Sequence, residues 1–153
     1  MKTGRTPFVK FAVVTLFVAL LAVGFGVAQT APDAPTPITI AQLKGTWTAA
    51  LSGVTGCGVS TLTVTFTLDS TGNGTQLNTI GHTAACGDSV TSGQPVQIQS
   101  FNPDGSGFIA FGCGAGCGFG FNMQVNKAKQ VFNLGPQSVP GNYLAGTAVK
   151  KNL

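Results

Sequence analysis

The feature that most constrains the fold is the strict alternation of side chains over residues 59–68. Large apolar side chains take turns there with threonines, namely Leu62, Val64, Phe66 and Leu68 with Thr61, Thr63, Thr65 and Thr67. Successive side chains of a β-strand point to opposite faces of the sheet, so one face is apolar and the other carries hydroxyls. The segment therefore predicts a strand that is buried on one side only.

The rest of the chain repeats this pattern in shorter form. Apolar runs alternate with clusters of Gly, Asn, Asp and Pro, and no run keeps a helical period. We expect strands at residues 45–51, 59–68, 74–80, 94–101, 106–113, 117–125, 130–134 and 142–149. Residues 38–44 predict a short turn or helical cap before the first strand. The predicted fold is all-β, an antiparallel up-and-down meander of about eight strands that forms a small barrel or, alternatively, a β-sandwich.

The glycine-rich segment 112–118 predicts a hairpin tip. If residues 114–116 form a three-residue loop, three pairs face each other on one side of the hairpin: Cys113 with Cys117, Phe111 with Phe119, and Ile109 with Phe121. A buried face requires its large side chains to lie together in this way. Facing cysteines also have a separation that suits a disulfide.

The chain has four cysteines, an even number that in a short exported protein indicates two disulfides. A zinc site would need two close cysteine pairs, and only one close pair exists here, with a wider spacing than zinc sites use. We therefore predict disulfides that stabilise the fold and no metal. The hairpin argument assigns Cys113–Cys117 and leaves Cys57–Cys86 as the remaining pair.

The turn at residues 102–105 leaves the register of its hairpin open. A two-residue loop would place Val96 and Ile98 on the apolar face with Phe111 and Ile109. A type I turn with a glycine bulge would instead place Ile98 opposite Ala110. The hydrophobic pattern favours the first register and the turn residues favour the second.

The N-terminus predicts export. Basic residues precede an apolar run over residues 11–23, and small residues follow at 26–28. We predict a signal peptide at residues 1–28, a Pro-rich tether at residues 29–41 and a single barrel-like domain at residues 42–153. The expected location is secreted or periplasmic. The alternative is a membrane anchor formed by an uncleaved leader, residues 11–28, which would be the chain's only link to a membrane.

Charge excludes nucleic acid as a partner. Three of the eight Lys and Arg residues lie in the leader, so the mature chain has five basic residues against four acidic ones. No basic stripe remains that could hold a phosphate backbone.

The sequence shows no catalytic constellation, and we predict neither enzymatic activity nor a cofactor. His82 is the only histidine, and the chain contains no Glu. We expect His82 to be a solvated loop residue, with Asp88 also in a loop. A Ser–His–Asp triad could in principle be assembled from Ser89, His82 and Asp88. However, no nucleophile elbow or other sequence signature of such a triad is present. Asp69 and Asp104 belong to turn motifs, where Asp accepts hydrogen bonds from its own backbone.

The segment Gly45-Thr46-Trp47 resembles the Gly-x-Trp opening of the calycin superfamily, which includes lipocalins, avidins and fatty-acid-binding proteins. That superfamily is built on an antiparallel barrel whose mouth takes small, often apolar ligands. The resemblance implies that Trp47 closes one barrel end beneath a basic side chain near the last strand, either Lys150 or Lys151. Without the resemblance, Trp47 is the largest core side chain of the first strand.

Two functions follow as expectations. The first is binding of a small, mostly apolar molecule inside the barrel, whose interior we expect to be lined by Trp47, Phe66, Ile109, Phe111, Phe119 and Phe121. The second is a structural or adhesive role in the cell envelope without a ligand. The threonine-rich face, the low charge and the Pro-rich tether favour that alternative.

Overall fold

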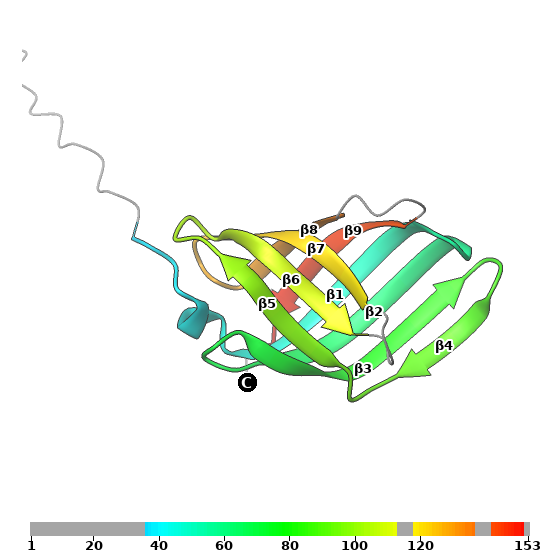
Figure 1. Ribbon diagram of the computed structural model, residues 1–153, viewed down its shortest axis with the longest axis horizontal. Coiled ribbons are helices and arrows are strands. Elements are labelled where there is room, and N and C mark those ends of the chain that lie inside the picture. The colour runs from blue at the N-terminus through cyan, green and yellow to red at the C-terminus, as the bar shows by residue number, and fades with distance from the viewer. Residues whose placement is uncertain (1–35, 113–117, 137–141, 152–153) are drawn as a thin grey trace, which may run out of the picture. The chain divides into compact units, whose positions relative to one another are not determined.

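The computed structural model describes residues 36–112, 118–136 and 142–151. These residues contain one short 3₁₀ helix and nine strands. Figure 1 labels the strands in chain order. The elements are η1 (Ile40–Leu43), β1 (Gly45–Thr55), β2 (Gly58–Leu68), β3 (Asn73–Thr83), β4 (Gly87–Thr91), β5 (Pro95–Phe101), β6 (Ser106–Gly112), β7 (Gly118–Val125), β8 (Val131–Pro136) and β9 (Tyr143–Lys150).

Eight of the strands close into an antiparallel barrel. Around the ring, each strand pairs with its neighbours in the order β1, β2, β3, β5, β6, β7, β8 and β9, and β9 pairs again with β1. The nine strands confirm the all-β prediction. The pairing of the first strand with the last shows that the strands form a barrel and not a sandwich. All eight predicted strands are present, within a few residues of their predicted ends.

The ninth strand, β4, was missed by the sequence prediction. It lies outside the ring because β3 is long enough to serve two partners on one edge. Residues Asn73–Thr75 of β3 pair with β5, whereas Thr79–Thr83 pair with β4. The β3–β4 hairpin therefore projects beyond the ring (Figure 1).

Gln76 marks the point where β3 changes partners. Its backbone N–H donates to Gln94 O, and its backbone oxygen accepts from the N–H of Gly93. Its side chain is only 1% exposed, yet both of its polar atoms are satisfied. Nε2 donates to Gly112 O at 2.6 Å, and Oε1 accepts from Thr79 Oγ1 at 2.7 Å. This buried amide is hydrogen-bonded at both its nitrogen and its oxygen, and the bond to Gly112 connects β3 to the end of β6.

The alternating faces of β2 are confirmed. Val64, Phe66 and Leu68 are buried, and the threonines between them lie on the outer face. Every ring strand except β3 contributes apolar side chains to one core, and β3 buries the polar Gln76 and Thr79 instead. The buried apolar members of the core are Ile38, Leu43, Trp47, Ala49, Leu51, Val64, Phe66, Leu68, Val96, Ile98, Ile109, Phe111, Phe121, Met123, Val125, Phe132, Leu134 and Ala148. Ile38 lies within the predicted tether but packs in this core.

In the β5–β6 hairpin the turn follows the second prediction, whereas the register of the apolar residues follows the first. The predicted pairing of Ile98 with Ala110 is wrong, because Ala110 pairs with Gln97. The N–H of Gly105 donates to Asn102 O, and Gly105 has a φ of 87°, as a turn ending in a left-handed glycine requires. The two strand pairs next to the turn, Phe101 with Gly107 and Ser100 with Phe108, have the register that this type of turn produces. A register shift between Ile98 and Ser100 then places Ile98 opposite Ile109 and Val96 opposite Phe111. One extra residue in β5 thus restores the apolar register.

The predicted disulfide Cys57–Cys86 is confirmed. It links the β1–β2 turn to the β3–β4 turn, with 5.4 Å between the two Cα atoms. The predicted Cys113–Cys117 bridge lies outside the described residues. Within the described part of the chain, no helix is long and apolar enough to span a bilayer.

Candidate functional site

One end of the barrel is closed by Trp47. The indole lies fully buried and stacks on Phe132 of β8, with 3.8 Å between the ring centroids. Its Nε1 donates to the backbone oxygen of Leu43, at the end of η1, at 2.9 Å. The helix therefore covers this end of the barrel and supplies the acceptor that the buried indole needs.

Lys150 completes the closed end. Its Nζ lies 5.5 Å from the centre of the Trp47 ring and donates to Gln42 O at 3.2 Å. Of the two predicted cations, Lys150 is the one that covers the indole. The structure also explains Gly45, because a Cβ built there would lie 2.8 Å from Cε of Lys150, and Gly45 has a φ of 139°.

Four phenylalanines fill the middle of the barrel. Phe111 is their hub, with ring centroids 5.1 Å from Phe66, 5.7 Å from Phe119 and 5.9 Å from Phe121. Most of the contacts are edge-to-face, which suits the charge distribution of aromatic rings. The interior is therefore packed rather than hollow at this level.

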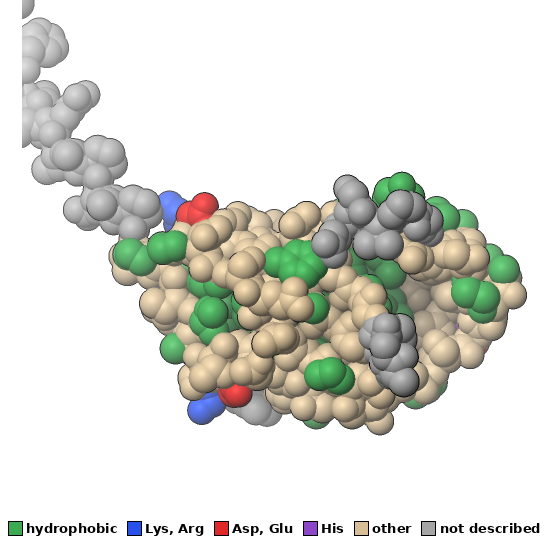
Figure 2. All heavy atoms as spheres, viewed as in Figure 1, with side chains coloured by type: hydrophobic (Ala, Val, Ile, Leu, Met, Phe, Trp, Pro, Cys, Tyr) green, Lys and Arg blue, Asp and Glu red, His purple; other side chains and the backbone are tan. Residues whose placement is uncertain are grey.

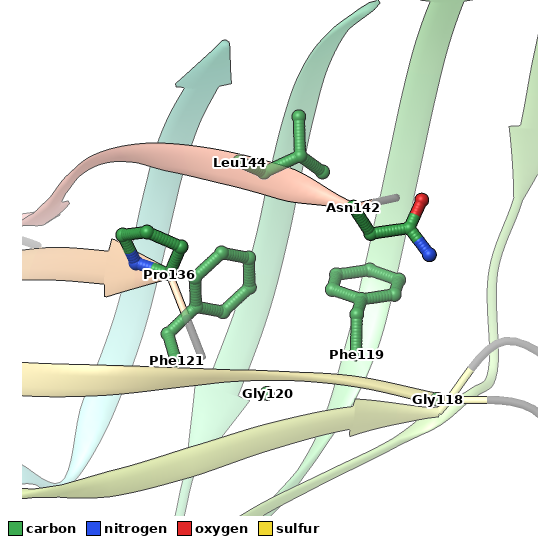
Figure 3. A pocket seen from close by; sticks show the side chains of 7 residues that line it. All are labelled: Gly118, Phe119, Gly120, Phe121, Pro136, Asn142 and Leu144. Carbon is green, nitrogen blue, oxygen red and sulfur yellow. The ribbon is translucent and has the colours of Figure 1, made fainter. Parts of the chain in front are cut away.

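A pocket of about 50 Å³ lies at the end of the barrel opposite Trp47. It forms where β8 and β9 stop pairing, since their last pair is Leu134 with Gly146. Its lining residues are Gly118, Phe119, Gly120, Phe121, Pro136, Asn142 and Leu144. Figure 3 shows the rings of Phe119 and Phe121 extending from β7 towards β9, and Leu144 and Asn142 facing them from the other side.

The chemistry of the pocket is apolar and uncharged. Two phenyl rings, a leucine and a proline supply its side-chain surface, and Asn142 supplies the polar group. Oδ1 of Asn142 accepts from the N–H of Gly56 at 3.1 Å, which fixes the amide against the β1–β2 turn. None of the described residues that line the pocket has an ionisable side chain. The arrangement can hold an apolar group beside one neutral hydrogen-bonding partner.

The six predicted lining residues separate into two groups. Phe119 and Phe121 line the pocket. Phe66, Ile109 and Phe111 are buried in the packed interior, and Trp47 is buried at the closed end of the barrel. Whether the six residues bind a ligand stays a prediction.

Sequence reasoning missed the pocket residues that come from outside β7. Leu144 could have been found, because alternation along the last strand places it on the inner face. Pro136 and Asn142 carry no such signal. They line the pocket only because β8 and β9 part beyond Leu134 and Gly146, and that divergence has no sequence signature.

The prediction that His82 and Asp88 lie in loops is wrong. They are cross-strand partners on β3 and β4, with 2.8 Å between His82 Nδ1 and Asp88 Oδ1. Their side chains are 60% and 76% exposed. Ser89, the next residue, points to the opposite face of the hairpin because strand side chains alternate. The three residues therefore do not converge on one site.

Among the described residues, no three His, Cys, Asp or Glu side chains gather in a group that could hold a metal ion. Comparison with known protein families finds no model that matches the chain, and comparison with curated proteins finds no similar sequence.

Proposed function

We propose that this chain is an exported carrier or receptor for a small, uncharged, mostly apolar molecule. One observation carries the proposal: a pocket lined by Phe119, Phe121 and Leu144 opens at one barrel end while Trp47 closes the other. Burial of apolar ligand surface there is favourable by about 25 cal/mol per Å². A charged ligand would lose its hydration without gaining a counter-charge.

The closed end supports a calycin-like origin for the barrel. Lys150 lies over the Trp47 indole, which agrees with the resemblance. Gly45, the first residue of the motif, leaves room for the lysine side chain. Export is supported by the basic and apolar leader and by Cys57–Cys86, since disulfides persist in oxidising compartments. The proposed location is therefore the periplasm or the external medium.

The direct test is to identify what the native protein carries. The protein is purified under native conditions, extracted with organic solvent and analysed by mass spectrometry. We expect a stoichiometric uncharged molecule that is lost from Phe119→Ala and retained by Phe108→Ala. Phe108 is the matched control because it lies on the outer face of the same hairpin, opposite Asn122. Repeated blank extracts from folded wild-type protein would contradict the proposal.

A second candidate is an adhesive or structural envelope protein, and the outer face of β9, β1 and β2 favours it. The outward side chains of these strands are Thr, Ser, Ala, Val or Tyr, and none is charged. Charged side chains are also sparse on the face of the molecule that Figure 2 shows. Threonines stand side by side in the pairs Thr46–Thr67 and Thr48–Thr65, and the two hydroxyls of the second pair lie 3.3 Å apart. Blank extracts, together with retention of the protein in washed cell envelopes, would favour this candidate.

A further inference from the structure

The β4 strand leaves one edge of the sheet uncovered. It pairs only with β3, and no other strand among the described residues takes its second edge. Figure 1 shows it at the rim of the domain, and all five of its residues are exposed. A free edge presents unpaired N–H and C=O groups that can pair with another strand.

Several of the usual protections of an edge strand are absent from β4, although the strand is short and carries one charge at Asp88. Its sequence, Gly87 to Thr91, contains no Lys and no Pro, and its pairing with β3 has no register shift. The Cys57–Cys86 bridge fixes the turn from which β4 starts. The edge is therefore held in extended form and ready to accept a further strand.

The side chains of β4 favour a particular partner. Val90 is 72% exposed, the largest value among the exposed large apolar side chains that the structure describes, and it lies beside Ile80 on the outer face. Asp88 is the only charged residue on the strand, and His82 is its neighbour on β3. A partner strand should therefore cover Val90 with an apolar side chain and bring no carboxylate near Asp88.

We propose that a second copy of this chain is that partner, through antiparallel pairing of β4 with β4 and Val90 opposite itself. A two-fold axis through this position makes the same patch serve both copies. The outer face then carries a continuous row of four apolar side chains, Ile80 and Val90 from each copy. Asp88 comes opposite Ser92, so the two carboxylates fall at opposite ends of the paired segment.

Other registers of this pairing are less favourable. A register centred on Asp88 would place the two carboxylates directly opposite each other, which is destabilising. One centred on Ser89 would place Asp88 opposite Val90 and leave the valine against a charge. A five-residue pairing buries well below the ~1,200 Å² of stable interfaces, so we expect a reversible dimer that depends on protein concentration.

The test is sedimentation velocity of the purified native protein over a range of concentrations. We expect the dimer fraction to rise with concentration, and Val90→Lys to weaken dimerisation at least tenfold. Val59→Lys is the matched control: Val59 is also a valine on the outer face, 68% exposed, but it lies on β2, which is paired on both edges. Near-UV circular dichroism verifies that each variant is folded.

A crosslink tests the register itself. Cα atoms of facing residues in an antiparallel pair lie about 4.5 to 5.5 Å apart, within reach of a disulfide. Mild oxidation should therefore link two copies of Val90→Cys and leave Val59→Cys and wild type unlinked. A monomer at every concentration, equal loss in the two lysine variants, or no linked dimer of Val90→Cys would overturn the proposal.

Discussion

At the scale of single residues, the closed end of the barrel depends on the fit between two side chains and one glycine. Trp47 is buried, Lys150 extends over its ring, and Gly45 has no side chain because Lys150 occupies the space. The sequence predicts the tryptophan and narrows the cation to two lysines. It gives no reason for Gly45, since that reason is a contact between residues more than a hundred positions apart.

Gly45→Ala tests this explanation. The φ of 139° at Gly45 is unfavourable for a residue with a Cβ, and the added methyl would crowd Lys150. We expect the free energy of unfolding, measured by urea denaturation, to fall by about 1 to 3 kcal/mol. Gly56→Ala is the control, because a Cβ at Gly56 meets nothing within 4 Å. Equal stability of the two variants would contradict the explanation.

At the scale of elements, turns set the local geometry and the core sets the register. The Asp104 carboxylate accepts from the hydroxyl and the N–H of Ser106 at 2.7 and 2.9 Å. The Asp69 carboxylate accepts in the same way from Thr71. Both contacts were predictable from the turn residues. The register shift in β5 was not, because it reconciles two local preferences that the sequence leaves in conflict.

These turns predict a dependence of stability on pH. The hydroxyl donors, with help from backbone N–H groups, lower the pKa of Asp69 and of Asp104 below the ordinary value of 3.8. As the pH falls, these carboxylates are therefore protonated in the unfolded chain before they are protonated in the folded one. Their contribution to stability is complete above pH 3.8, the ordinary pKa, and is lost as the pH falls through the lower pKa values of the folded state.

The measurement is urea denaturation of wild type and of the double variant Asp69→Asn, Asp104→Asn between about pH 5 and pH 2. Wild type should lose stability over this interval, and the double variant should lose less of it. Two parallel curves would show that these carboxylates do not carry the effect.

Strand β4 shows which strands an alternating pattern of apolar and polar residues does not reveal. Alternation reveals a strand because one of its faces is buried, and β4 is exposed along its whole length. Its residues therefore have no need of an apolar stripe, and the short sequence Gly-Asp-Ser-Val-Thr resembles that of a loop. Only the pairing with β3 makes it a strand.

At the scale of the whole molecule, the fold class was predictable and the closure was not. Eight amphipathic strands in sequence indicate a barrel or a sandwich, and the choice rests on the pairing of β1 with β9 at opposite ends of the chain. The pocket depends on the same long-range geometry. It exists because β8 and β9 separate at one end, while aromatic rings fill the middle.

The disulfide should stabilise the molecule as a whole. Cys57 and Cys86 are 29 positions apart, and a bridge over that distance restricts the unfolded chain by about 3 to 4 kcal/mol in the chain-entropy model. We expect Cys57→Ser, Cys86→Ser to lose about that much unfolding free energy in urea. The comparison is Cys113→Ser, Cys117→Ser, whose predicted bridge closes a much shorter loop and should matter less. A larger loss of unfolding free energy in Cys113→Ser, Cys117→Ser than in Cys57→Ser, Cys86→Ser would contradict the view that Cys57–Cys86 is the more stabilising bridge.

The most direct test of ligand binding is an NMR titration of ¹⁵N-labelled protein with indole, an uncharged and mostly apolar probe. The account predicts saturable shifts of the amides of Phe119, Phe121 and Leu144, which weaken in Phe119→Ala and persist in Phe108→Ala. Benzoate, a charged probe of similar size, should bind more weakly. Shifts that do not saturate, or that lie away from these three residues, would contradict the proposal that this end of the barrel is a binding site.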